Sequence, residues 1–163
     1  MDMVLIRHGT AEPLGSPGVR FDAERALTSE GIRDMEKIAM GLQRILEKPG
    51  AMISSPLVRA RQTAEIVAEA FGITAEELIE DERLGPDAGP QDLLEVAQKT
   101  RKDCVVLVGH DPAFSRFVSF AACSHHRGGV WMKKGGVARV QVSEGEMELL
   151  WLLPPKIMKA LAE

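Results

Sequence analysis

The chain has 163 residues, of which 45% are hydrophobic and 27% are charged, as in an ordinary globular protein. This length predicts a single domain over residues 1–163, with a core large enough to fold without a metal or a disulfide. The net charge of −4 argues against a nucleic-acid partner, because phosphate backbones are bound by basic surfaces. No apolar run approaches the ~20 residues that span a bilayer, so we expect a cytoplasmic protein with no membrane partner.

The first part of the chain predicts a strand, a loop and a helix. The apolar run 3–6 is short and ends at a turn signal, which is typical of a buried strand. Glycines and prolines mark residues 10–27 as a loop. Apolar residues then recur at helical spacing from 32 to 46, and Thr28 is of a type that caps such a helix. Lys48-Pro49-Gly50 is expected to end it.

The remaining elements continue the alternation of strand and helix. Ser55-Pro56 predicts an N-cap and a first helical residue, and Gly72 ends that helix. Further strands are expected at 51–53, 78–79 and 104–108, helices at 91–99 and 113–121, a hairpin at 137–142 and 147–153, and a last short helix from Pro154-Pro155. The order indicates an α/β fold: a three-layer sandwich with a mostly parallel central sheet flanked by helices.

Polar side chains follow three of these strands, at the point where each strand ends. They are Arg7-His8-Gly9, Ser54-Ser55-Pro56 with Arg59, and Gly109-His110-Asp111. Ligands of open α/β sheets bind at the carboxyl ends of the strands. If the three strands are neighbours, two imidazoles and two guanidiniums converge on one point. The alternative is three separate turns with surface ion pairs.

Arg59 and Arg61 lie in or beside the first turn of the helix after Pro56, where a positive charge opposes the helix dipole. Glu65 lies one turn beyond Arg61 and can pair with it, whereas Arg59 has no acid at that spacing. An anion held between Arg59 and the helix N-terminus would remove the conflict. Phosphate is the natural candidate, because it matches the planar guanidinium.

These residues resemble the histidine phosphatase superfamily, whose fold is phosphoglycerate mutase-like. Its signature is a strand ending in Arg-His-Gly, here residues 5–9. Residues 25–31 look like the family's Leu-Thr-x-x-Gly helix start, and residues 54–65 and 108–112 match two further blocks in the family's order. The short length and the Ser-Pro-x-x-Arg-Ala-x-Gln-Thr-Ala-Glu block resemble its bacterial phosphohistidine phosphatase branch, of the SixA type.

The resemblance implies an enzyme whose His8 attacks phosphorus and is transiently phosphorylated. The other catalytic residues would neutralise the phosphoryl oxygens, which requires no metal and no cofactor. They are Arg7, Arg59 and His110. Residues expected to contribute to substrate binding are Gly9, Arg25, Ser55 and Asp111. Arg25 matches an arginine that precedes the Leu-Thr block in this branch, with a solvated loop residue as the alternative.

The substrate is left open between two classes. A phosphate ester expels an alkoxide and needs a general acid, whereas phosphohistidine expels imidazole, with a pKa of roughly 6.5, and needs little proton assistance. Asp111 follows the second histidine, as the proton donor of the acid phosphatase branch does, but a residue before Pro112 is also a good N-cap. Glu82 and Asp87 are further candidate acids that a solvated loop explains as well.

The favoured hypothesis is a phosphatase that dephosphorylates phosphohistidine on a partner protein and releases inorganic phosphate. Little chain is left for a lid between the second and third motif helices, and an open site suits a phosphorylated protein. The alternatives are a phosphomonoesterase of small esters that uses Asp111 or Asp87, and a non-catalytic phosphate-binding module. Two basic segments, Met132-Lys133-Lys134 and His125-His126-Arg127, could form a patch that docks an acidic partner.

Overall fold

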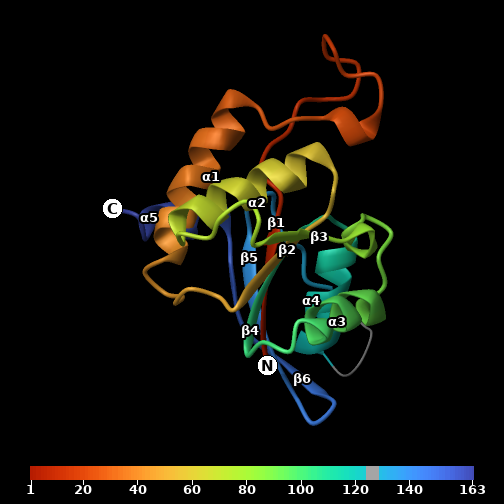
Figure 1. The fold of residues 1–163 in the computed structure, drawn as a ribbon, viewed down its shortest axis with the longest axis vertical. Coiled ribbons are helices and arrows are strands. Elements are labelled where there is room, and N and C mark those ends of the chain that lie inside the picture. The colour runs from red at the N-terminus through yellow and green to blue at the C-terminus, as the bar shows by residue number, and fades with distance from the viewer. Residues whose placement is uncertain (124–128) are drawn as a thin grey trace.

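Residues 1–123 and 129–163 are described by a computed structural model, in which six strands form one mixed sheet (Figure 1). The order across the sheet is β3-β2-β4-β1-β5-β6. The first four of these run parallel, and β5 and β6 add an antiparallel hairpin. The strands are β1 (Asp2–Arg7), β2 (Ala51–Ser54), β3 (Leu78–Glu80), β4 (Cys104–Gly109), β5 (Val137–Ser143) and β6 (Glu146–Leu153).

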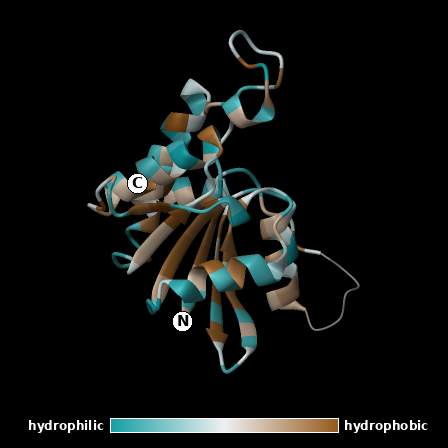
Figure 2. Ribbon diagram, turned by 45° about the vertical axis from the view of Figure 1, so that its right-hand side comes forward, coloured by the Kyte–Doolittle hydropathy of each residue, from teal (hydrophilic) through white to brown (hydrophobic). Residues whose placement is uncertain are grey.

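Helices cover both faces of the sheet, so the expected three-layer α/β sandwich is confirmed. On one face lie α1 (Ser29–Leu42), α2 (Val58–Ala70) and α5 (Pro155–Ala160), and on the other α3 (Pro90–Lys99) and α4 (Ala113–Ala122). Figure 2 shows the hydrophobic strands enclosed between helices whose outer sides are hydrophilic. No helix within the described residues is long and apolar enough to cross a membrane.

The two central strands are apolar throughout because they have packing partners on both sides. In β1, Val4 and Ile6 face the cluster under α1 and α2, whereas Met3 and Leu5 face the cluster under α3 and α4. All four side chains are fully buried, as are residues 105–108 of β4. Burial of each such side chain contributes about 1.5–3 kcal/mol. These strands therefore form a rigid base for the residues that follow them.

Two helix boundaries differ from the sequence prediction. The helix after Thr28 ends at Leu42, well before Lys48-Pro49-Gly50, and residues 43–45 form turns instead. Gly41, a poor helix former, lies in this last turn, and its missing side chain lets the Met158 carbonyl of α5 approach. The second difference concerns α2, which begins at Val58 with Leu57 as its N-cap, so the predicted N-cap at Ser55 is wrong.

The chain between β1 and α1 rises above the carboxyl edge of the sheet (Figure 1). It contains one short 3₁₀ helix, η1 (Asp22–Glu24), and a bridge between Ala11 and Leu27 closes its base. A second 3₁₀ helix, η2 (Glu82–Leu84), follows β3. At the end of the segment between β1 and α1, Thr28 caps α1 as predicted, because its Oγ1 accepts a hydrogen bond from the Gly31 amide at 2.9 Å.

Candidate active site

The carboxyl ends of β2, β4 and β1 are adjacent, so the three polar segments expected there converge. The ring centroids of His8 and His110 are 5.1 Å apart. Arg59, from the first turn of α2, places its Nε 3.3 Å from His8 Nε2. The three side chains are almost completely enclosed, with exposed fractions of 6%, 1% and 4% for His8, His110 and Arg59. Arg7 lies beside them at the end of β1.

Hydrogen bonds determine the tautomer of His8. Its Nδ1 lies 2.7 Å from the Gly9 carbonyl, which can only accept, so Nδ1 carries the proton and Nε2 presents a lone pair. Thr63 steadies this arrangement, since its Oγ1 accepts from the Gly9 amide at 3.2 Å and donates to the Arg59 carbonyl at 2.7 Å.

The His8 imidazole is held in its neutral form. Burial lowers the pKa of His8 to about 3; the hydrogen bond to Gly9 opposes the shift, and the nearby charges of His110, Arg59 and Arg7 add to it. A neutral ring with its lone pair on Nε2 is the form that a nucleophilic histidine requires, and here that lone pair accepts a 3.3 Å contact from Arg59 Nε.

His110 is fixed by Ser55, and one of its ring nitrogens is left over. Ser55 Oγ lies 2.9 Å from His110 Nε2 and accepts from the Leu57 amide at 3.3 Å, so the hydroxyl proton is free to point at Nε2. The ring proton then sits on Nδ1, which is buried without a hydrogen-bond partner. Burial, followed by the charge of Arg59, lowers the pKa of His110 to about 4, although Asp22 opposes this. Ser55 thus orients His110 instead of capping α2.

Arg7 and Asp111 form a second fixed pair. Arg7 Nη1 lies 3.2 Å from Asp111 Oδ2 and also donates to the Met132 carbonyl, whereas Arg7 Nε is buried without a partner. The other oxygen of Asp111 accepts from the amide and the hydroxyl of Ser115, at 3.2 and 2.7 Å. Both carboxylate oxygens of Asp111 are therefore occupied by bonds that hold α4 and Arg7 in place.

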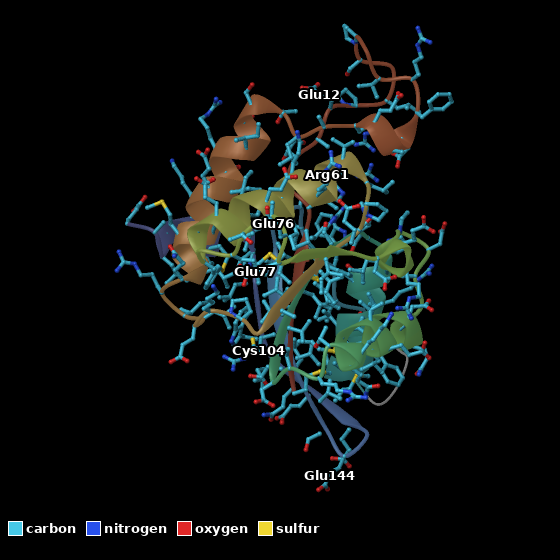
Figure 3. The ribbon with its side chains drawn as sticks, in the orientation of Figure 1. Glu12, Arg61, Glu76, Glu77, Cys104 and Glu144 are labelled. Atoms are coloured by element: carbon cyan, nitrogen blue, oxygen red, sulfur yellow. The ribbon has the colours of Figure 1, made fainter. Side chains whose placement is uncertain are left out.

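Arg59 has an acidic partner that its own helix does not provide. Asp22 of η1 accepts from Arg59 twice, through its carboxylate at 2.9 Å and its carbonyl at 2.8 Å. Arg25 binds the same carboxylate at 2.9 Å and the Glu12 carbonyl at 2.6 Å. Burial raises the pKa of Asp22, but hydrogen bonds from Arg25 and Arg59 outweigh this and lower it. The expectation that Arg59 lacks an acid is thus correct only for α2. Arg61 lies on the exposed side of α2 (Figure 3), and its Nε is 3.6 Å from Glu65 Oε1.

Lys134 is a further basic residue of this region that the sequence did not single out for the site. Burial, and the charges of Arg7, Arg25 and Arg59, lower the pKa of its ammonium group. The chain is anchored there because the Gly135 amide donates to the carbonyls of Arg7 and His8, at 3.0 and 3.2 Å. The only available signal was the Lys133-Lys134 pair before two glycines, which is indistinguishable from a solvated turn.

The other candidates lie apart from these contacts. Glu82 and Asp87 are exposed in the segment after β3. His125-His126-Arg127 fall outside the described residues. Within the parts of the chain that the structure describes, no three His, Cys, Asp or Glu side chains come together as a metal site would require.

Comparisons with known proteins agree with this geometry. The family model of the histidine phosphatase superfamily (branch 1) matches residues 3–89, so the chain belongs to this superfamily. An uncharacterized protein of Picosynechococcus sp. is 31% identical, over 94% of this chain and 100% of its own length.

Solved structures place the fold within the same group. The protein histidine phosphatase SixA in complex with tungstate superposes with a TM-score of 0.80, at 21% identity over 97% of this chain and 99% of that one. A putative phosphohistidine phosphatase SixA from Agrobacterium tumefaciens gives a TM-score of 0.74, at 25% identity over 94% and 98% of the two chains. The SixA-type, phosphoglycerate mutase-like fold expected from the sequence is confirmed.

Proposed function

We propose that this histidine phosphatase removes the phosphoryl group from phosphohistidine on a partner protein, with His8 as the nucleophile. The observation that carries the proposal is the pair of unpartnered nitrogens. Within the described residues, the buried side-chain nitrogens without a hydrogen bond are Arg7 Nε and His110 Nδ1, and both belong to this site. A buried polar group without a partner costs about 1–3 kcal/mol. A phosphoryl group, rich in acceptor oxygens, is the ligand that would satisfy both.

The proposed reaction has two displacements. His8 Nε2 attacks phosphorus, the bond from phosphorus to the substrate imidazole breaks, and the electron pair leaves with that imidazole, which takes a proton from solvent. Arg7, Arg59 and His110 Nδ1–H donate to the phosphoryl oxygens and offset the charge of the transition state. Water then attacks the phosphohistidine at His8, releases inorganic phosphate and restores the neutral ring.

The surroundings of the site favour imidazole over an alkoxide as the leaving group. An alkoxide needs a protonated acid beside it. Asp22 and Asp111, the carboxyl groups that contact Arg59 and Arg7, are each held in an ion pair with arginine, so neither is free to act as such an acid. Glu82 and Asp87 are exposed in the segment after β3, apart from the contacts of the two histidines. Imidazole, with a pKa of roughly 6.5, leaves without such help.

The test is to follow phosphate through His8. Wild-type protein quenched during turnover of a phosphohistidine peptide should carry acid-labile, alkali-stable phosphate on His8, and His8→Asn should carry none and lose turnover. Arg61→Gln, on the exposed side of α2, is the matched control and should behave as wild type. Turnover in the His8→Asn variant at a near-wild-type rate would overturn the covalent mechanism. Hydrolysis of small esters without any hydrolysis of phosphohistidine would overturn the substrate.

A further inference from the structure

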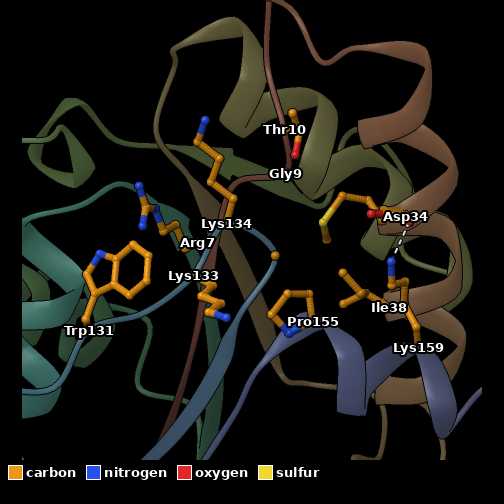
Figure 4. Close-up of a pocket in the computed structure, with 12 residues that line it drawn as sticks. Arg7, Gly9, Thr10, Asp34, Ile38, Trp131, Lys133, Lys134, Pro155 and Lys159 are labelled. Carbon is orange, nitrogen blue, oxygen red and sulfur yellow. Dashed lines mark hydrogen bonds and ion pairs between the residues drawn. The ribbon is translucent and has the colours of Figure 1, made fainter.

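A pocket of about 350 Å³ opens directly beside the phosphoryl site (Figure 4). Arg7 and Gly9 belong to both, so a ligand in the pocket would be continuous with a phosphoryl group at His8. In Figure 4, Trp131, Lys133 and Lys134 lie on the side of Arg7, and Lys159 lies across from them on α5. A single phosphate fills only a small part of such a volume. The pocket therefore has room for the part of the substrate that flanks the phosphoryl group.

The charge of the lining is positive and unbalanced. Lys133 and Lys134 are exposed, and neither makes an ion pair with a residue of 1–123 or 129–163. The acid in the lining, Asp34, is already bound to Lys159 at 2.8 Å, as the dashed line in Figure 4 marks. The remaining positive charge at the pocket mouth belongs to two lysines, which an acidic group of a ligand would balance.

The floor of the pocket is apolar. Met35 and Ile38 of α1 contribute fully buried side chains, and Pro155 lies next to them. Trp131 stands at the opposite wall with 66% of its surface exposed. Tryptophan and other aromatic residues are enriched where proteins bind partners, because they bury a large area on contact. The occupant therefore combines negative charge with an apolar side chain.

We infer that this pocket binds an acidic segment of the partner protein beside its phosphohistidine, with carboxylates at Lys133 and Lys134 and one apolar side chain against Trp131. The inference rests on the proposed function and adds the substrate's sequence context to it. A flanking segment is favoured over a separate molecule, since the pocket is continuous with the phosphoryl site through Arg7 and Gly9. The pocket is a specificity site, and Trp131, Lys133 and Lys134 contact neither the phosphoryl group nor the leaving group.

Two phosphohistidine peptides provide the test, one with Asp and Glu at the flanking positions and one with Ser and Gln there. The acidic peptide should have the lower KM at an equal kcat, with a difference that shrinks as salt is raised from 20 to about 300 mM. In the Lys133→Gln/Lys134→Gln double variant, the KM ratio of the two peptides should collapse toward one. At roughly 1.5- to 5-fold per exposed charge contact, the loss of two contacts should change the KM ratio by roughly 2- to 25-fold.

A matched control removes two lysines elsewhere. Lys99→Gln/Lys102→Gln lowers the charge equally at the end of α3 and before β4, at the opposite edge of the sheet, and should leave the KM ratio at its wild-type value. Trp131 gives a second readout, since its fluorescence should change when the unphosphorylated acidic peptide binds to Trp151→Phe protein. Equal KM values for both peptides in the wild type would overturn the inference while leaving phosphohistidine hydrolysis intact. Failure to hydrolyse either peptide would instead overturn the proposed function.

Discussion

At the scale of single residues, some polar groups of the site are hydrogen-bonded within the protein, whereas two buried nitrogens have no partner there. Thr63, Ser55 and Asp111 each use their oxygen atoms within the protein, on Gly9, His110 and Arg7 respectively. Arg7 Nε and His110 Nδ1 have no such partner. Arg59 differs from both sets, since its guanidinium nitrogens contact His8 and Asp22 and a phosphoryl group would have to compete for them.

The role of Asp111 is tested by Asp111→Asn. Because both oxygens of Asp111 are bound to Ser115 and Arg7, the change should slow hydrolysis of phosphohistidine and of an ester by the same factor. Asparagine keeps an oxygen that can accept from the Ser115 amide, so the change should cost little stability. The measurement is the ratio of the two rates relative to wild type. A general acid would instead slow the ester alone by roughly 10²–10⁴-fold, and that result would favour the phosphomonoesterase.

Asp22 competes with phosphate for Arg59, which leads to a second residue-scale prediction. Its carboxylate holds an Arg59 Nη atom that a phosphoryl oxygen would otherwise bind. Asp22→Asn removes the charge and should strengthen competitive inhibition by inorganic phosphate roughly 2- to 5-fold, the size of an exposed ion pair. Glu24→Gln is the control on the same 3₁₀ helix, since Glu24 accepts from the amides of Arg20 and Phe21 and, within the described residues, not from Arg59. Weaker inhibition in Asp22→Asn would show that Asp22 positions Arg59 instead.

At the scale of elements, the start of α1 explains the Leu-Thr-x-x-Gly block. Thr28 caps α1 through Gly31, and the Thr28 amide donates to the Thr10 carbonyl at 2.9 Å, just beyond His8-Gly9. A side chain at Gly31 would collide with that carbonyl. The absence of a side chain at Gly31 therefore brings the helix start against the segment that carries His8, the proposed nucleophile.

Gly31→Ala should accordingly destabilise the protein by about 1–3 kcal/mol, the usual cost of overpacking. The collision is with backbone that cannot rotate away, so the Thr10 segment must shift and activity should fall as well. Ser29→Ala, at an exposed first position of the same helix, is expected to change neither quantity appreciably. Denaturant unfolding and kcat/KM are the measurements. A Gly31→Ala variant as stable as wild type would mean that α1 moves freely against the loop.

Local patterns predicted the elements well, and contacts between distant segments account for what they missed. Apolar runs identified β1 and β4 because a strand covered on both faces has no polar positions. The predicted start of α2 was wrong, because the Ser55 hydroxyl hydrogen-bonds to His110, which follows another strand. The pairing of Asp22 with Arg59 spans 37 residues, and no periodicity encodes it. The same holds for Lys134, which reaches the site only because its chain is bound to the carbonyls of Arg7 and His8.

At the scale of the whole molecule, the two hydrophobic clusters lie on opposite faces of one sheet and share its strands. We still predict a single cooperative domain over residues 1–163. Both clusters pack against the same strands, so unfolding those strands would expose both clusters to water. The buried histidines are part of this unit, since they follow strands from its centre. Their protonation is therefore coupled to unfolding of the whole chain.

The last prediction is the pH dependence of stability that this coupling produces. The pKa values of His8 and His110 are about 3 and about 4 when folded, below the ordinary 6.5 of an unfolded histidine. Between pH 6.5 and those values the unfolded chain binds protons that the folded protein excludes. The free energy of unfolding is thus undiminished above pH 6.5 and falls as the pH drops, by up to about 1.4 kcal/mol per pH unit for each histidine.

Aspartate and glutamate side chains take up few protons until the pH is lower, so the change in unfolding free energy between pH 6.5 and 5 reports on the histidines. Denaturant unfolding across this window should give a shallower slope for His8→Asn, and a shallower one still for His8→Asn/His110→Asn. Parallel curves for all three proteins would mean that the two rings are protonated in the folded state.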